Sequence, residues 1–349
     1  MNKRLLILIG LILIFQACNR DGAKYIANNG TIYGTYYSIK YEIPDGVDLQ
    51  PDIEKELHRL SRIFSHYDKE ATITKVNSNT PVELESEFVT CFLKAEEISK
   101  ITNGAFDITA GPLISAWGFG PEDREKMTAE KVDSLKEFCG YEKIRLENGQ
   151  ILKENPHMTI NMSAIAKGYT CDLIGEFLQK KGCLNYMVDI GGEVVAKGVN
   201  DKDKIWTIGI REPIENPFEN ELSAALMLNN RAMATSGNYL NFYEEDGKKY
   251  AHTIDPISGY PVQHSLLSAS VVANDCMTAD AFATAFMVLG KDVGIEIARQ
   301  VPGMEIYFIY ADESGENQVY MSEGFGEMLR KQKKPVTYRL LYLLLNSIF

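Results

Sequence analysis

The stretch ANDCMTADAFATAFMVLG, residues 273–290, shows how the interior of this protein is built. From Ala279 onward nearly every residue is Ala, Phe, Met, Val or Leu, which predicts a helix buried among neighbouring elements. We expect helical structure over residues 278–301, with a break at Gly290. Asp280 and Thr284 interrupt the apolar run, and their spacing places them on one face of the helix.

Two interpretations of this polar pair are open. If Thr278 is the N-cap, Asp280 lies in the first turn, where a carboxylate interacts favourably with the helix dipole. Thr284 would then donate its hydroxyl to a carbonyl one turn earlier. Alternatively, the two side chains bind a hard cation, because Asp and Thr oxygens suit Mg²⁺. The stretch taken alone does not choose between a helix-dipole role and a metal site.

The rest of the chain mixes strand and helix patterns without a regular β-α-β order, which predicts an α+β fold. Ser163 is an N-cap candidate for one helix, and Gly182 is suited to end it. Strands are predicted over residues 31–43, 184–192, 205–213, 225–237, 265–273 and 304–312, and helices over residues 52–67, 88–101 and 163–181.

Composition limits the function classes. The 349 residues allow one large domain or two ordinary ones, and 45% hydrophobic with 24% charged residues is typical of a globular protein. The net charge of −12, without a basic patch upstream of the C-terminal tail, argues against a nucleic-acid partner. Beyond Cys18 there are five cysteines and no CxxC pair, so we expect buried free thiols rather than disulfides or a zinc site (Cys91, Cys139, Cys171, Cys183 and Cys276).

The N-terminus has the pattern of an export signal. MNKRLLILIGLILIFQAC combines a basic start, an apolar run too short to span a bilayer, and a small residue before Cys18. The pair Ala17-Cys18 resembles a bacterial lipobox. We therefore expect a lipoprotein signal peptide over residues 1–17, lipidation of Cys18 and a polar tether over residues 18–29. This predicts an extracytoplasmic protein anchored by lipid to a bacterial membrane, on the periplasmic side. An ordinary secretory signal is the alternative.

The C-terminal tail, residues 328–349, has a basic run followed by the apolar segment YRLLYLLLNSIF. It is too short to cross a bilayer as a helix. A helix docked on the domain and a helix lying at a membrane surface are both consistent with this pattern.

Three further segments place polar residues in glycine-rich or apolar surroundings. TNGAFDITAGPLISAWGFG, residues 102–120, has the glycines that let a backbone approach a ligand closely, although an ordinary loop is the alternative. In INMSAIAKGYTCD, residues 160–172, Lys167 lies near a helix start, a place that attracts phosphate; a surface lysine is the alternative.

In YAHTIDPISGYPV, residues 250–262, His252 is a candidate general base. The alternative is a half-buried histidine with a backbone hydrogen-bond partner.

These segments occur together in an order that resembles the ApbE-type flavin transferases, periplasmic FAD:protein FMN transferases that are often lipoproteins. The resemblance covers roughly residues 30–325 and implies an ApbE-type domain over residues 30–327. The implied fold is ApbE-like, with mixed, largely antiparallel sheets, packed helices and a T-fold-like core. The matching pieces, in chain order, are GTYYSIKY, FSHYDKEATITKVN, GAFDITAGPLISAWGFG, SAIAKGYTCD, YMVDIGGEV, ATSGNY, HTIDPISGYPV and TADAFATAFMVLG.

The resemblance implies a reaction in which FAD is split at its pyrophosphate. FMN is joined through a phosphoester to a Thr hydroxyl of an extracytoplasmic target protein, such as the flavin subunit of a redox pump, and AMP leaves. Mg²⁺ is required, which suits the charge that develops on phosphate oxygens. Water in place of Thr would make the protein an FAD pyrophosphatase, and a protein without turnover would be a non-catalytic FAD-binding lipoprotein.

Site residues follow from the resemblance, position by position. Asp280 and Thr284 match the metal-binding side chains, and Ala164 matches the position that offers its carbonyl to the metal. We predict His252 and Asp280 as catalytic residues, with His252 as the base that activates the target Thr. Two positions depart from the family: Tyr33 replaces a frequent Met, and Asn161 replaces an Asp. The FAD contacts implied are Tyr33, Tyr67, Ala105, Phe106, Asp107, Asn161, Lys167 and Ile254.

Overall fold

The computed structural model describes residues 24–43, 46–119, 125–211, 222–238, 242–245, 248–251 and 253–329. Cys18, the predicted signal peptide, His252 and residues 330–349 lie outside the described residues. Among the described helices, none has the length and apolarity needed to cross a membrane.

An eight-stranded sheet runs through the domain in the order β1-β2-β5-β6-β9-β12-β13-β14, and every neighbouring pair in it is antiparallel. Its strands are β1 (Tyr25–Ile32), β2 (Thr35–Glu42), β5 (Tyr186–Ile190), β6 (Glu193–Lys197), β9 (Arg231–Gly237), β12 (Leu266–Ala273), β13 (Glu305–Ala311) and β14 (Asn317–Met321). The predicted α+β class with largely antiparallel sheets is confirmed.

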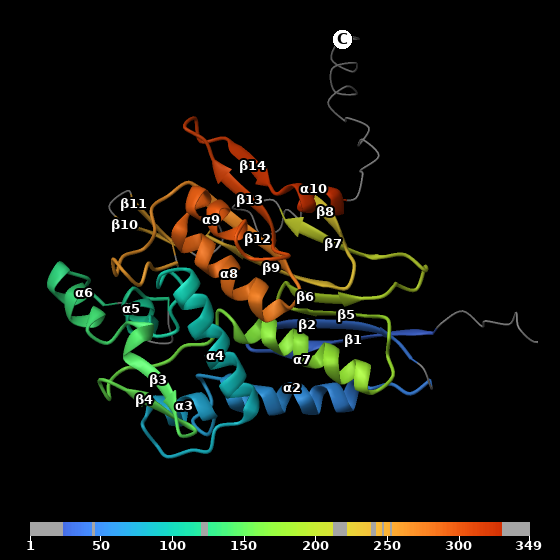
Figure 1. Cartoon of the computed structure of the whole chain (residues 1–349), viewed down its shortest axis with the longest axis horizontal. Coiled ribbons are helices and arrows are strands. Elements are labelled where there is room, and N and C mark those ends of the chain that lie inside the picture. Colours follow the sequence, from blue (N-terminus) through green and yellow to red (C-terminus); the bar gives the residue numbers. More distant parts are fainter. Residues whose placement is uncertain are drawn as a thin grey trace, which may run out of the picture.

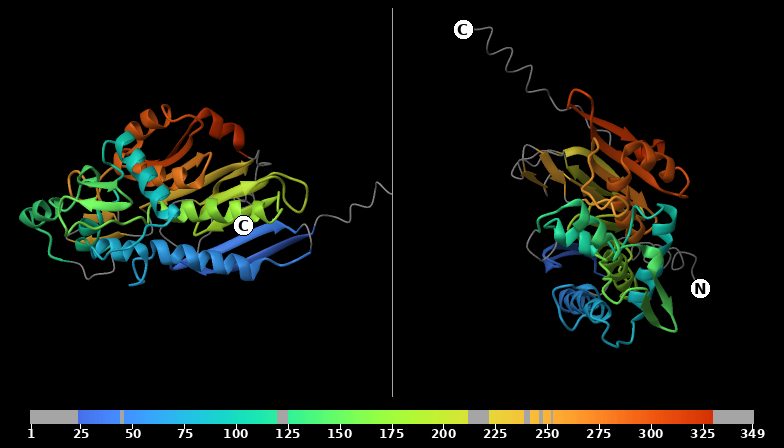
Figure 2. Two further views of the ribbon diagram at one scale, coloured as in Figure 1. Left: turned by 60° about the horizontal axis from the view of Figure 1, so that its bottom comes forward. Right: turned by 90° about the vertical axis from the view of Figure 1, so that its left-hand side faces the viewer.

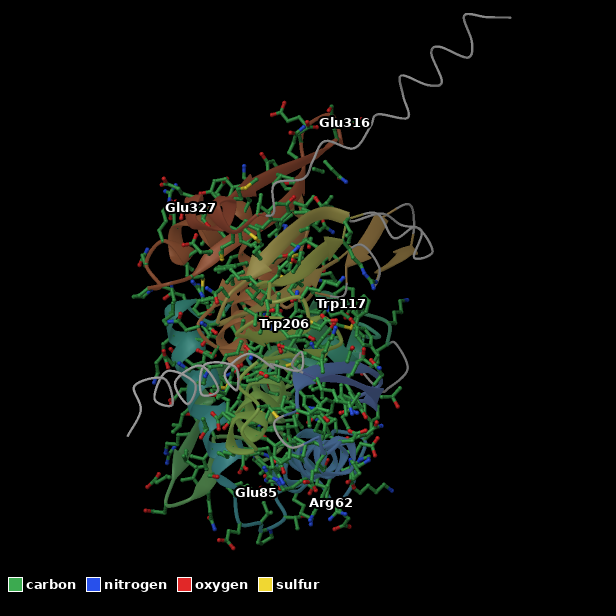
Figure 3. All side chains as sticks on the ribbon, turned by 90° about the vertical axis from the view of Figure 1, so that its right-hand side faces the viewer. Arg62, Glu85, Trp117, Trp206, Glu316 and Glu327 are labelled. Carbon is green, nitrogen blue, oxygen red and sulfur yellow. The ribbon has the colours of Figure 1, made fainter. Side chains whose placement is uncertain are left out.

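The two faces of this sheet are covered by different elements, and side chains alternate between them. In β13, Ile306 and Phe308 join the core beneath helix α8 (Cys276–Leu289). Tyr307 and Ile309 join a second core beneath the hairpin β7 (Trp206–Arg211) and β8 (Leu222–Leu228). Trp206 points into the interior, whereas Glu316 and Glu327 lie at the periphery (Figure 3). The sheet is therefore buried on both faces in its central part.

Helices α7 (Ala166–Lys180) and α8 lie next to each other on the sheet (Figure 1). The segment that carries α5, α6 and the β3–β4 hairpin projects at one end of the domain (Figures 1 and 2). The remaining elements are α2 (Gln50–Phe64), α3 (Thr72–Asn77), α4 (Ser86–Ile101), α5 (Gly111–Ala116), α6 (Ala129–Lys136), the short 3-10 helix η1 (Tyr141–Lys143), β3 (Ile144–Glu147), β4 (Gln150–Lys153), β10 (Phe242–Glu245), β11 (Lys248–Ala251), α9 (Lys291–Ala298) and α10 (Glu323–Met328).

Helices α7 and α8 cap each other. The first backbone N–H groups of a helix have no partner inside it. Asp172 of α7 accepts hydrogen bonds from Cys276 N and Met277 N of α8, both at 2.8 Å. In return, Asp280 of α8 accepts one from Gly168 N at the start of α7, through Oδ2 at 2.9 Å. Each helix thus fixes the start of the other.

Gly168 allows α7 and α8 to approach each other closely, because it has no side chain. A Cβ atom at this position would lie 2.3 Å from the carbonyl oxygen of Cys276 and 2.8 Å from Asp280 Cβ. Neither atom is the end of a flexible side chain, so a larger residue would push the helices apart.

Several predicted boundaries need correction. Helix α8 begins at Cys276 with Asp275 as the N-cap, which accepts from Thr278 N at 2.8 Å, so Thr278 is not the cap. Asp280 therefore lies beyond the first turn and faces the start of another helix instead. Ser163 is not an N-cap either, because α7 begins at Ala166. The break at Gly290 and the stop at Gly182, whose φ is 86°, are confirmed.

The strand predictions also change. Residues 225–237 divide into β8 and β9, which belong to different sheets, because the chain turns at residues 229–230. The predicted tether over residues 18–29 ends earlier than expected: β1 starts at Tyr25, and its pairing with β2 forms a hairpin around Tyr33 and Gly34. Met328 still belongs to α10, so the domain also extends past residue 327. The five cysteines described are free and buried, as predicted.

We predict that Gly168→Ala destabilises the protein by about 1–3 kcal/mol, the usual cost of overpacking a filled interior. Urea denaturation measures this. Gly326→Ala in α10 is the matched control, because its Cβ would meet only Met321 Sδ, at 3.6 Å. The control should leave stability unchanged or raise it by up to about 1 kcal/mol. Equal stability of Gly168→Ala and the wild type would contradict the close contact.

Candidate active site

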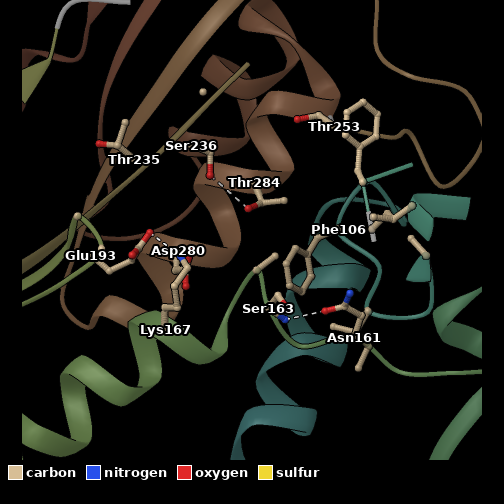
Figure 4. Close-up of a pocket in the computed structure, with 18 of the residues that line it drawn as sticks. Phe106, Asn161, Ser163, Lys167, Glu193, Thr235, Ser236, Thr253, Asp280 and Thr284 are labelled. Atoms are coloured by element: carbon tan, nitrogen blue, oxygen red, sulfur yellow. Dashed lines mark hydrogen bonds and ion pairs between the residues drawn. The ribbon is translucent and has the colours of Figure 1, made fainter. Parts of the chain in front are cut away.

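A cavity of about 1640 Å³ opens between the helix pair, the sheet and the projecting segment. It is larger than the roughly 300–1,000 Å³ usual for one small ligand. Its wall brings together residues far apart in sequence, among them Phe106, Asn161, Lys167, Glu193 and Thr284 (Figure 4). The cavity therefore has room for a large substrate and for part of a second one.

A buried charged cluster forms one wall. Lys167 Nζ lies 2.7 Å from Glu193 Oε1 and 3.8 Å from Asp280 Oδ1 (Figure 4). Burial raises the pKa of Glu193 to about 7, against the opposing effect of Lys167. Burial also raises the pKa of Asp280. For Lys167, burial alone would lower the pKa, but the charges of Asp280 and Glu193 raise it above its usual value. Lys167 therefore carries a positive charge between two carboxyl groups.

Hydroxyl groups line the wall next to this cluster. Thr284 Oγ1, one turn beyond Asp280 on α8, lies 3.3 Å from Ser236 Oγ of β9. Thr235 Oγ1 lies 2.8 Å from Ser270 Oγ of β12. Asp280 and Thr284 both line the cavity, so the predicted pair does share the face that a ligand would meet.

The residues here fit a hard divalent cation. Asp280 Oδ2 is used by Gly168 N, which leaves Oδ1 for a ligand. Within the described residues, Glu193 Oε2 is buried and has no hydrogen-bond partner. Lys167 is at hydrogen-bond distance from Glu193 but not from Asp280, and a divalent cation would favour the charged form of the Asp280 carboxyl group.

The described residues contain no group of three or more His, Cys, Asp or Glu side chains arranged to hold a metal. The predicted donor set differs in kind, since it combines one carboxylate, one hydroxyl and the carbonyl of Ala164. Ala164 lines the cavity and lies just before Ile165, the N-cap of α7.

The carboxylate of Asp107 holds the glycine-rich segment, residues 102–120, through hydrogen bonds. Asp107 Oδ1 accepts from Thr109 N at 2.7 Å and from Thr109 Oγ1 at 2.6 Å, and Oδ2 accepts from Tyr141 N at 2.9 Å. Ala105, Phe106 and Asp107 all line the cavity. The carboxylate of Asp107 thus fixes the loop that faces the ligand.

On another wall, Asn161 Oδ1 accepts from Ser163 N at 2.9 Å, which bends the chain ahead of α7 (Figure 4). Tyr67 lies at the rim with 84% of its surface exposed, an arrangement that leaves its ring free to cover a planar ligand. Ile254 is buried and supplies an apolar part of the lining.

The structure brings most of the predicted site residues around this one cavity, namely Tyr67, Ala105, Phe106, Asp107, Asn161, Ala164, Lys167, Ile254, Asp280 and Thr284. Tyr33 is the exception. It is not part of the lining: its hydroxyl lies 3.1 Å from Thr170 Oγ1, and its ring packs on the core between β1, β2 and α7. The hairpin turn directs this side chain to α7, and the flavin contact expected at Tyr33 stays a prediction. His252 lies outside the described residues.

Sequence reasoning missed Glu193, His66 and Ser236, which also line the cavity. The signal for Glu193 was an acid directly after two glycines at the start of a strand. Burial lowers the pKa of His66, so its ring is uncharged near neutral pH.

A deep cavity lined by an ammonium, carboxyl groups and hydroxyls on rigid elements is the kind of site that enzymes use. A profile of the ApbE family matches residues 33–308. The FAD:protein FMN transferase of Haemophilus influenzae is 36% identical over 326 residues, which cover 89% of this chain and 93% of that protein. The FAD:protein FMN transferase of Vibrio cholerae is 33% identical, with coverage of 93% and 99%.

Solved structures agree. The flavin transferase ApbE from Vibrio cholerae matches with a TM-score of 0.79 and 32% identity, over 88% of this chain and all of that chain (100%). The apo form of the flavinyl transferase ApbE from Pseudomonas stutzeri matches with a TM-score of 0.79 and 28% identity, over 88% and 97%. The chain belongs to the ApbE family.

We predict that Asp280→Asn and Asp280→Ala both abolish binding of Mn²⁺, used as a probe for Mg²⁺, but differ in stability. Asn can still accept from Gly168 N, whereas Ala leaves this buried N–H unpaired, at a cost of about 1–3 kcal/mol. Electron paramagnetic resonance of free Mn²⁺ and urea denaturation measure the two effects. Wild-type Mn²⁺ affinity in Asp280→Asn would rule out Asp280 as a ligand.

Proposed function

We propose that this protein transfers FMN from FAD to the hydroxyl of a Thr in a target protein, with release of AMP, in a reaction that depends on Mg²⁺. The observation that carries this proposal is the buried cluster of Lys167, Glu193 and Asp280 in the wall of a cavity larger than one small ligand needs. The family relatives named FAD:protein FMN transferase support the same reaction class.

Each part of the cavity has a task in this proposal. Asp280, Thr284 and the carbonyl of Ala164 would hold Mg²⁺. When bound, Mg²⁺ supplies a Lewis acid that neutralises charge on the pyrophosphate oxygens. Lys167 places a positive charge beside the same oxygens, in a wall that leaves its side chain only partly exposed to solvent. The loop held by Asp107 and the aromatic ring of Tyr67 would position the flavin part.

The nucleophile is a Thr hydroxyl, which needs a base to remove its proton. We assign this role to His252 from the sequence alone. It would take the proton as the hydroxyl oxygen bonds to the FMN phosphorus and the bond to the AMP phosphate breaks.

The deciding experiment incubates the protein with FAD, Mg²⁺ and a purified candidate acceptor flavoprotein, followed by mass spectrometry of the acceptor and chromatography of the nucleotides. We expect the acceptor to gain one FMN phosphoester and AMP to appear, and EDTA to stop both. Release of free FMN with an unmodified acceptor would identify an FAD pyrophosphatase, and recovery of intact FAD would identify a binding protein.

For His252→Ala we predict FAD binding as in the wild type and a loss of FMN transfer of about 10²–10⁴-fold, the usual contribution of a general base. Flavin fluorescence measures the binding and mass spectrometry the transfer. Normal transfer in this variant would assign the base elsewhere.

We also propose that the protein works outside the cytoplasm, anchored through lipidated Cys18, because the N-terminus has the pattern of an export signal that ends at this residue. We expect the wild type in the membrane fraction and Cys18→Ser in the soluble extracytoplasmic fraction. A Cys18→Ser protein that remains with the membrane would disprove the lipid anchor at this position.

A further inference from the structure

In the charged cluster of Lys167, Glu193 and Asp280, the proposed reaction assigns a role to Lys167 and Asp280 but none to Glu193. We propose that Glu193 is a positioning residue that holds the Lys167 ammonium away from Asp280 and so keeps Asp280 Oδ1 available to the divalent cation. This inference rests on the proposed cation site at Asp280 and Thr284.

The ammonium of Lys167 lies closer to Glu193 than to Asp280. Lys167 Nζ lies 2.7 Å from Glu193 Oε1, which is a hydrogen-bond distance. It lies 3.8 Å from Asp280 Oδ1, which is too far for a hydrogen bond. Asp280 Oδ2 is already occupied by Gly168 N. Oδ1 is therefore the oxygen for which an ammonium and a metal ion would compete.

Lys167 has the freedom to move to Asp280 if nothing holds it. It lies near the start of α7, and its side chain is a flexible four-carbon stem with 30% of its surface exposed. A direct ion pair with Asp280 Oδ1 would neutralise the carboxylate and weaken the metal site. A partner for the ammonium on the other side prevents this.

Glu193 is suited to be that partner because it is rigid. It is the first residue of β6, which is hydrogen-bonded to β5 and β9, and its side chain is only 5% exposed. The preceding turn is fixed by Asp189 Oδ1, which accepts from Gly192 N at 2.9 Å. The backbone of Glu193 is therefore fixed, and its buried side chain has less room to move than that of Lys167.

The free oxygen of Glu193 also argues for a functional role. In the described part of the chain, Oε2 is buried without a hydrogen-bond partner, an arrangement that costs a protein stability. A residue selected only for stability would be satisfied or apolar here. The alternative role for Glu193 is direct binding of the cation through Oε2, and a double-mutant cycle separates the two.

The test measures Mn²⁺ binding to the metal-free protein by electron paramagnetic resonance, without FAD and without turnover. The proteins are the wild type, Glu193→Gln, Lys167→Met and the double variant, and thermal melting checks that each is folded. Lys167→Gln replaces Lys167→Met if the latter does not fold. Asp189→Asn is the matched control, because it removes a negative charge from the same cavity wall at a residue bonded to Gly192 N and Tyr36 Oη instead of Lys167.

We expect Glu193→Gln to weaken Mn²⁺ binding by about 10–100-fold, the usual effect of losing a residue that orients a metal site. Asp189→Asn should have a much smaller effect. In the Lys167→Met background, Glu193→Gln should have no effect, since no ammonium remains to reach Asp280.

Equal weakening by Glu193→Gln with and without Lys167 would show that Glu193 acts on the cation itself and would overturn the proposal, as would unchanged binding in Glu193→Gln. These outcomes leave the proposed function intact as long as Asp280→Asn abolishes Mn²⁺ binding. Wild-type protein that fails to bind Mn²⁺ would overturn the cation site and this inference together.

Discussion

The reciprocal capping of α7 and α8 is the interaction on which the rest of the cavity depends. A helix start needs acceptors for its free N–H groups, and each of these helices takes them from a carboxylate of the other. Asp280 serves α7 in this way with one oxygen and faces the cavity with the other. The same bond thus stabilises the fold and orients the proposed metal ligand. Gly168 is required because it lets the two backbones approach closely enough for the bond to form.

The charged cluster is arranged for a ligand rather than for stability. Two buried carboxyl groups share a single lysine, and one carboxylate oxygen has no partner among the described residues. Buried charges of this kind are usually fully paired in a structure that binds nothing. A divalent cation and a pyrophosphate would complete the pairing, since the cation meets the carboxylate and the lysine meets the phosphate oxygens. The incompletely paired cluster and the cavity size fit the reaction class that the family membership shows.

Buried periodicity is a local signal, and it predicted the α+β class and the break after α8. The site residues came from the resemblance to the ApbE family, and most of those predicted line the cavity. Tyr33 lies outside the cavity lining because a hairpin turn, whose first strand β1 falls largely in the predicted tether, directs its side chain to α7; its flavin contact stays a prediction. Glu193 was missed because an acid after a glycine pair looks like a turn residue, and only the fold shows that it is buried beside Lys167. The partner of Asp280 could not be predicted either, because the sequence of α8 does not show that Gly168 N of α7 donates to this carboxylate.

Anomalous diffraction from crystals of the protein grown with FAD and Mn²⁺ would locate the cation directly. We predict a peak at coordination distance from Asp280 Oδ1, Thr284 Oγ1 and the Ala164 carbonyl oxygen, with the FAD pyrophosphate beside Lys167. A peak at other residues, or FAD bound at full occupancy with no peak near Asp280, would contradict the arrangement described above.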